Sequence, residues 1–139
     1  MNLDQLESLM REVAEGVGGA SAEVGRIERP RHDGVFIKLT SATQPGTFAI
    51  VSTSGSGAFE LTVNGGFYTG MADDQAGVDD ARGYIQSYVR AARSYLDGHW
   101  SIRKSRVLRV PILTIQNGTS RLNLASPGHG SSNDPRLSF

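Results

Sequence analysis

The chain of 139 residues contains no cysteine. It therefore has no disulfide, no thiolate nucleophile and no thiolate zinc site. It also lacks an apolar run of about 18 residues, the length that a membrane-spanning helix needs. Its N-terminal stretch MNLDQLESLMREVAEGVGG is acidic, whereas a secretory signal begins with basic residues and an unbroken apolar run. These absences predict a soluble, cytoplasmic protein without a membrane span.

Net charge is absent as well, because 14 basic residues balance 14 acidic residues. The chain as a whole is therefore not expected to bind nucleic acid by charge alone. The charges are nevertheless unevenly distributed along the chain. The early carboxylates are Asp4, Glu7, Glu12, Glu15 and Glu23, opposed by Arg11 alone, and the late cations, which have no carboxylate among them, are Arg103, Lys104, Arg106, Arg109 and Arg121. Any electrostatic function must come from this local asymmetry.

Two segments have helical periodicity. Leu3, Leu6, Leu9, Met10, Val13 and Val17 recur at intervals of three and four residues, with Asn2 as the cap and 16-GVGG-19 as the stop. A longer helix is predicted over Val78–Asp97, with Gly98 in a left-handed cap. Its packing face holds Ala81, Tyr84, Ile85, Tyr88, Val89, Ala92, Tyr95 and Leu96, whereas Arg82, Arg90 and Arg93 lie outside that face.

Several short β-rich segments, separated by turn residues, predict an antiparallel sheet. Between the helices these segments are 24–30, 34–40, 47–53 and 58–64, and after the long helix 108–115 and 121–125 flank the hairpin signal Asn117-Gly118. The expected fold is α+β, with about six strands, an N-terminal helix and one long helix packed on the sheet. We expect one domain over residues 1–125 and a disordered tail over 126–139.

Catalytic groups that converge are not evident. His32, His99 and His129 lie in unrelated contexts, and neither a triad-like context nor an HExxH helix occurs. The acidic stretch 73-DDQAGVDD-80 lacks the spacing of a calcium loop, and 54-SGSGAF-59 and 65-GGFYTG-70 lack phosphate-loop patterns. The sequence therefore predicts no enzyme, no metal and no cofactor. One enzymatic alternative stays open, a cleft near Tyr68, Asp73 and Trp100.

The basic stretch 97-DGHWSIRKSRVLRVP-111 has three interpretations. It contacts nucleic acid, or it packs Trp100, Val107 and Leu108 inward with its cations in water, or it docks a protein. Nucleic acid is the least favoured, because the chain has no aromatic ribonucleoprotein motif, no GxxG loop and no net positive charge. Phe67 and Tyr68 beside Gly65-Gly66 either close the core or anchor a partner. The predicted partner-binding residues are Phe67, Tyr68, Trp100, Arg103, Lys104 and Arg106.

The stretch 58-AFELTVNGGFYTG-70, followed by 78-VDDARGYIQSYVRAARSYLDGHW-100, resembles the small immunity proteins of bacterial polymorphic-toxin and contact-dependent inhibition systems. The resemblance covers about residues 33–115 and concerns layout: a β-meander, a glycine-aromatic turn, a long helix and a basic segment. It implies a cytoplasmic, non-enzymatic protein that neutralises a cognate toxin by stoichiometric binding. A secretion chaperone or a small regulatory binding subunit is the alternative, ahead of a nucleic-acid-binding protein or a small enzyme.

Overall fold

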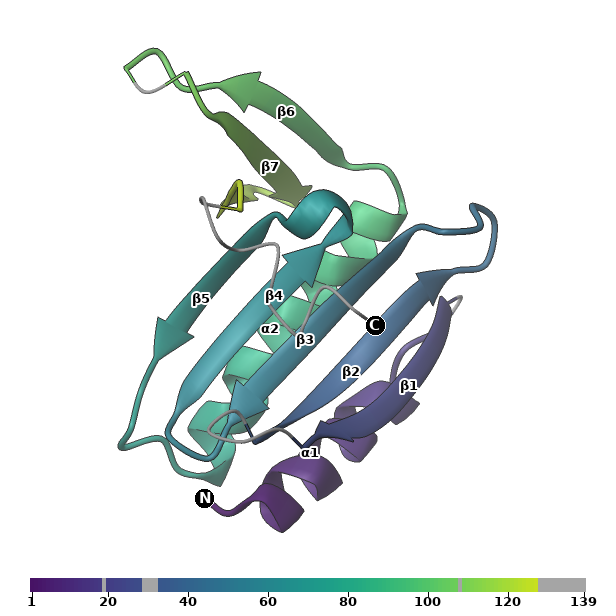
Figure 1. Cartoon of the computed structure of the whole chain (residues 1–139). Coiled ribbons are helices and arrows are strands. Elements are labelled where there is room, and N and C mark those ends of the chain that lie inside the picture. The colour runs from purple at the N-terminus through teal and green to yellow at the C-terminus, as the bar shows by residue number, and fades with distance from the viewer. Residues whose placement is uncertain (19, 29–32, 108, 128–139) are drawn as a thin grey trace.

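The computed structural model describes residues 1–18, 20–28, 33–107 and 109–127. This part of the chain has an α+β fold, in which two helices lie behind one antiparallel sheet (Figure 1). The sheet has eight strands in the order β1-β2-β3-β4-β5-β8-β7-β6. The predicted tail begins with residues 126 and 127, and its remaining residues, 128–139, lie outside the described part of the chain.

After the N-terminal helix, the strands β1 to β5 precede the long helix α2, and the strands β6 to β8 follow it. In chain order they are α1 (Leu3–Glu15), β1 (Ala20–Ile27), β2 (Gly34–Ser41), β3 (Phe48–Ser54), β4 (Ala58–Val63), the 3-10 turn η1 (Asn64–Gly66), β5 (Tyr68–Ala72), α2 (Val78–Leu96), β6 (Trp100–Lys104), β7 (Pro111–Asn117) and β8 (Ser120–Ala125).

The sheet is larger than the six strands predicted from the sequence, because β5 and β6 are strands as well. The segment YTGMA of β5 is short and contains Gly70, which weakens any strand signal. The segment WSIRK of β6 is exposed at every position. Its charged residues therefore suggested a basic loop, although backbone pairing with β7 makes it a strand.

The core lies between the sheet and the two helices. Its largest fully buried side chains include Met10 of α1, Ile37 and Leu39 of β2, Phe59 of β4 and Ile85 of α2. The predicted packing face of the long helix is confirmed, because all of its members are buried except Tyr84, which is half-buried. A smaller apolar cluster of Ile27, Phe36 and Ile50 gathers on alternate residues of β1, β2 and β3, which point to the opposite face of the sheet.

The predicted helix ends are also confirmed. The Asn2 side chain accepts a hydrogen bond from the Gln5 amide (2.8 Å), and the Gln5 side chain accepts one from the Asn2 amide (3.0 Å), which makes a capping box. At the end of α2, Gly98 has a φ of 85° and donates to the Tyr95 carbonyl, while His99 donates to the Ser94 carbonyl. These two bonds form a Schellman motif, which turns the chain from α2 into β6.

The early carboxylates are used inside the fold. Arg26 of β1 forms ion pairs with Asp4 and Glu7 of α1. Arg82 of α2 donates to Glu12 of α1 at 2.7 Å. Three carboxylates of the N-terminal helix therefore face cations on β1 and α2, while the buried side chains of the same helix supply most of its attachment.

The sheet has a weak junction between β5 and β8, which are joined by the single residue pair Tyr68–Ala125. On one side of this junction lies the meander β1 to β5, and on the other side lie β8, β7 and β6. The hairpin formed by β6 and β7 extends beyond the end of the main sheet (Figure 1). The basic stretch of the sequence is thus held away from the body of the protein.

Candidate protein-binding hairpin

The candidate site is the segment 100–110, called here the basic hairpin arm, which consists of β6 and the loop that leads into β7. Within the described residues, six large hydrophobic side chains are exposed, and four of them lie in this arm. They are Trp100, Ile102, Val107 and Val110. Apolar side chains that gather on a surface mark interaction sites more often than isolated ones do. The arm therefore combines exposed apolar side chains with the basic charge seen in the sequence.

The loop of the arm is closed by backbone hydrogen bonds. Ser105 donates to the Val110 carbonyl at 2.9 Å, and Arg109 donates to the Ser105 carbonyl at 3.0 Å. Arg109 has a φ of 53°, which makes it the one non-glycine residue with a positive φ in the described part of the chain. Such a conformation costs about 1–3 kcal/mol, so the surrounding loop must hold it.

The two faces of β6 carry different residues. Trp100 pairs with Ile115 and Ile102 pairs with Leu113, and these β7 partners are fully buried. Trp100 and Ile102 therefore lie on the helix side of the sheet, because paired residues share a face. Arg103, which pairs with Ile112, lies on the opposite side.

An aromatic contact joins the arm to the body of the protein. The Trp100 ring lies 5.5 Å from the Tyr95 ring, centroid to centroid. Tyr95 is buried in α2, and its hydroxyl donates to Asn64 Oδ1 at 3.1 Å. Asn64 in turn donates to the Gly46 carbonyl and accepts from the Phe48 amide. Burial raises the pKa of the Tyr95 hydroxyl, so this hydroxyl stays protonated and keeps its donor.

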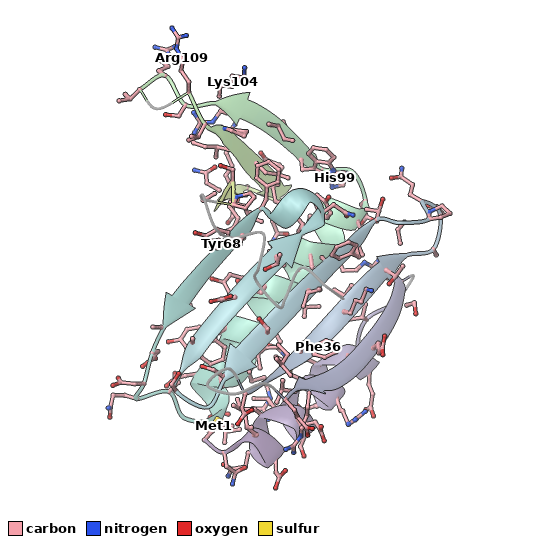
Figure 2. All side chains as sticks on the ribbon, viewed as in Figure 1. Met1, Phe36, Tyr68, His99, Lys104 and Arg109 are labelled. Carbon is pink, nitrogen blue, oxygen red and sulfur yellow. The ribbon has the colours of Figure 1, made fainter. Side chains whose placement is uncertain are left out.

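The cations of the arm make no ion pair with any described residue. Arg103, Lys104 and Arg106 are all exposed, as is Arg109. No Asp or Glu occurs between residues 98 and 133. Figure 2 shows Lys104 and Arg109 at the outer end of the arm. The positive charge is therefore available to a partner.

Tyr68 begins β5 and lies on the same face of the sheet as Arg103. The register places Tyr68, Ala125, Ile112 and Arg103 in one row across β5, β8, β7 and β6. Three strand spacings separate the first and last of them, about 14 Å. The structure thus places Tyr68 and Arg103 on one side of the sheet and Trp100 on the other.

Phe67 follows the core-closing alternative that the sequence left open, whereas Tyr68 is exposed. Gly65 and Gly66 form the glycine turn before these two residues, with φ of 79° and 78°. The ring of Phe67 is half-buried and packs against the core. Strand alternation explains the difference, because Phe67 and Tyr68 are adjacent and must point to opposite faces.

The inward-packing interpretation of the basic stretch is contradicted at Val107, which is 88% exposed. Trp100 packs only in part, with 41% of its surface exposed. Leu108, the third residue of that interpretation, lies outside the described residues. Ile102 and Val110 were not predicted as site residues. The alternation of Trp100 and Ile102 with polar neighbours is the signal that could have indicated them.

The acidic stretch before α2 has structural contacts. Asp73 accepts a hydrogen bond from the Tyr84 hydroxyl at 2.6 Å, which raises the pKa of Tyr84. Asp79 pairs with Arg82 at 2.9 Å, and Asp80 accepts from the Gly77 amide at the start of α2. Among the residues that the structure describes, no group of three or more His, Asp or Glu is placed to hold a metal ion.

The residues of the enzymatic alternative do not converge. Asp73 contacts Tyr84 in the first half of α2, whereas Trp100 begins β6, beyond the C-terminal end of α2 at Leu96. Tyr84 lies 12 residues before Leu96 (96 − 84), the last residue of α2, which is about 18 Å along the helix axis. His99 lies at the Trp100 end, and His32 and His129 lie outside the described residues. Tyr68, Asp73 and Trp100 therefore do not form one cleft.

Comparison with protein families, curated proteins and solved structures found no match for this chain. Within the described residues, no helix is both long and apolar enough to span a membrane. The fold and the basic hairpin arm are thus the features from which a function can be argued.

Proposed function

We propose that this protein is a non-enzymatic binding protein that acts by stoichiometric contact with another protein through the basic hairpin arm. One observation carries the proposal: exposed apolar side chains occur together with cations that make no ion pair to any described residue, on a segment that extends beyond the main sheet. Protein interfaces combine these two features, with apolar anchors at the centre and arginines around them.

A protein partner fits the arm better than nucleic acid does. Phosphate contacts would use the cations, and a base could stack on Trp100. Ile102, Val107 and Val110 would add nothing to either contact, yet they are exposed on the same arm. A protein surface can cover all three, and their burial would contribute to affinity.

The resemblance to immunity proteins supplies the kind of partner in this proposal. The partner is a bacterial toxin, and the protein neutralises it in the cytoplasm by covering a surface that the toxin needs. A secretion chaperone or a regulatory subunit would bind its partner through the same arm, and the effect of the partner on growth separates these classes.

The proposed contact can be tested by photo-cross-linking in cells of the source organism. A photoreactive residue at position 102 should yield one discrete protein adduct. The matched control is position 78, because Val78 is comparably exposed (45% against 50%) but lies at the other end of α2. Adducts from position 78 and not from 102 would contradict the assignment of the arm.

Growth then tests the immunity role. The cross-linked partner, produced alone, should arrest bacterial growth, and co-production of this chain should restore growth. A charge reversal, Arg103→Glu, should weaken the rescue. A partner that leaves growth unaffected would contradict the immunity role and favour a chaperone or regulatory subunit.

A further inference from the structure

The outer edge of β6 ends the sheet, because β6 is the last strand in the strand order. Two hydrogen bonds define how β6 pairs with β7. The Gln116 amide donates to the His99 carbonyl at 2.8 Å, and the Ser105 amide donates to the Val110 carbonyl at 2.9 Å. In antiparallel pairs, residues that bond to the partner strand alternate with residues that do not. His99, Ser101, Arg103 and Ser105 therefore face β7 with their backbone groups.

It follows that the backbone N–H and C=O groups of Trp100, Ile102 and Lys104 point away from β7. All three residues are exposed, and no described strand pairs with this edge. Such an edge is a template for a further strand, which would form the missing backbone hydrogen bonds.

The positive charge of the arm favours an acidic partner strand over a second copy of this chain. A second copy of this chain would bring two sets of cations together, with no carboxylate from either arm to balance them. Lysine and arginine on an edge oppose that kind of self-association. The same cations attract a strand that carries carboxylates.

We propose that the outer edge of β6 binds an extended acidic segment of a protein partner by strand addition. This inference rests on the proposed function and specifies how the partner binds. Because strand residues alternate between faces, one face of the added strand would lie beside Trp100 and Ile102, with Lys104 at the outer end of the same face, and would be apolar where it contacts Trp100 and Ile102. The other face would lie beside Arg103 and would carry carboxylates.

A synthetic peptide tests the proposal without knowledge of the partner. The probe is the capped peptide acetyl-EVEVEVE-amide, and its matched control is acetyl-KVKVKVK-amide. Titration of the ¹⁵N-labelled full chain with the acidic peptide should slow hydrogen exchange at the amides of Trp100, Ile102 and Lys104. The basic peptide should leave exchange unchanged, and Arg103→Glu should weaken binding of the acidic peptide about tenfold.

Two substitutions at one position separate backbone pairing from side-chain contact. Ile102→Pro removes an outward amide that β7 does not use, and proline is tolerated at such edge positions. Ile102→Ala removes the side chain and keeps the amide. The proline variant should lose the acidic peptide while its β7 amides remain protected, and the alanine variant should still bind it.

The proposal is overturned by any of three results. These are no binding of the acidic peptide, equal binding of both peptides, or binding that leaves the three outward amides in fast exchange. Self-association of the free protein through β6, seen by sedimentation and lost in Ile102→Pro, would also overturn it. Peptide binding that persists in Ile102→Pro would reject strand addition. It would leave the proposed function standing, because cross-linking and growth test that function separately.

Discussion

The ring of Trp100 lies against the ring of Tyr95, with centroids 5.5 Å apart and planes inclined by 34°. This contact joins β6 to the end of α2, at the point where the basic hairpin arm leaves the body of the protein. Tyr95 is 4% exposed and Trp100 is 41% exposed. The Tyr95 ring therefore belongs to the core, whereas the Trp100 ring packs on the core with one part and faces solvent with the other.

Removal of the two rings should have unequal effects on stability. Tyr95→Ala should lower the free energy of unfolding by about 3–5 kcal/mol, because it leaves a cavity and removes one of the two hydrogen bonds that the Asn64 oxygen accepts. Trp100→Ala should lower it by only about 1–2 kcal/mol, because much of the ring is already in water. Urea denaturation of both variants measures this difference. Equal losses would contradict the assignment of Trp100 to the binding surface.

Acid should loosen the contact between α1 and α2. The hydrogen bond from Arg82 lowers the pKa of Glu12 below its ordinary value. A carboxylate with a lowered folded pKa stabilises the fold above its unfolded pKa, and this contribution disappears as the pH falls through the folded pKa. Thermal stability should therefore fall between about pH 5 and pH 3.

The variant Glu12→Gln should show a shallower loss of thermal stability over that pH range than the wild type. The control is Glu15→Gln, at an α1 carboxylate that makes no ion pair with any described residue. A pH profile for Glu12→Gln that coincides with the wild-type profile would show that the Arg82 contact does not form in solution.

Gly57 should be far less tolerant of alanine than its neighbour Gly55. Gly57 has a φ of 89°, and a Cβ atom there would lie 2.6 Å from the Asp73 carbonyl oxygen. Gly57→Ala should therefore lower the free energy of unfolding by at least about 2 kcal/mol. At Gly55 a Cβ atom would come no closer than 3.9 Å to Leu3, so Gly55→Ala should cost within about 0.5 kcal/mol. Similar losses in chemical denaturation would mean that the β3–β4 turn is wrongly described.

Strong local patterns predicted much of the fold. The periodicity of α2 was sufficient to predict its buried face, and Asn2 and Gly98 indicated the helix ends correctly. The Asn117-Gly118 signal located the last hairpin, although its two central residues are Gly118 and Thr119. These features could be predicted because each depends on residues that are close in the sequence.

The features of the structure that the sequence did not predict depend on pairing between segments that are distant in the chain. The alternation of Trp100 and Ile102 with polar residues is typical of a strand, but it does not show that β6 pairs with β7. The side on which Phe67 lies depends on the register of β5, which residues 58–62 and 125 determine. The pairing of Arg26 and Arg82 with α1 likewise brings together residues far apart in the chain. Sequence patterns are local and do not contain this information.

The most direct test of the central claim is calorimetric titration of the cross-linked partner with the wild type, Arg103→Glu and Arg90→Glu. Arg90 is a matched control, because it is an exposed cation on α2, without an ion pair to any described residue and outside the arm. We expect one partner molecule per chain, binding weakened about tenfold or more by Arg103→Glu, and wild-type affinity for Arg90→Glu. Equal affinities for all three proteins would contradict a binding function of the basic hairpin arm.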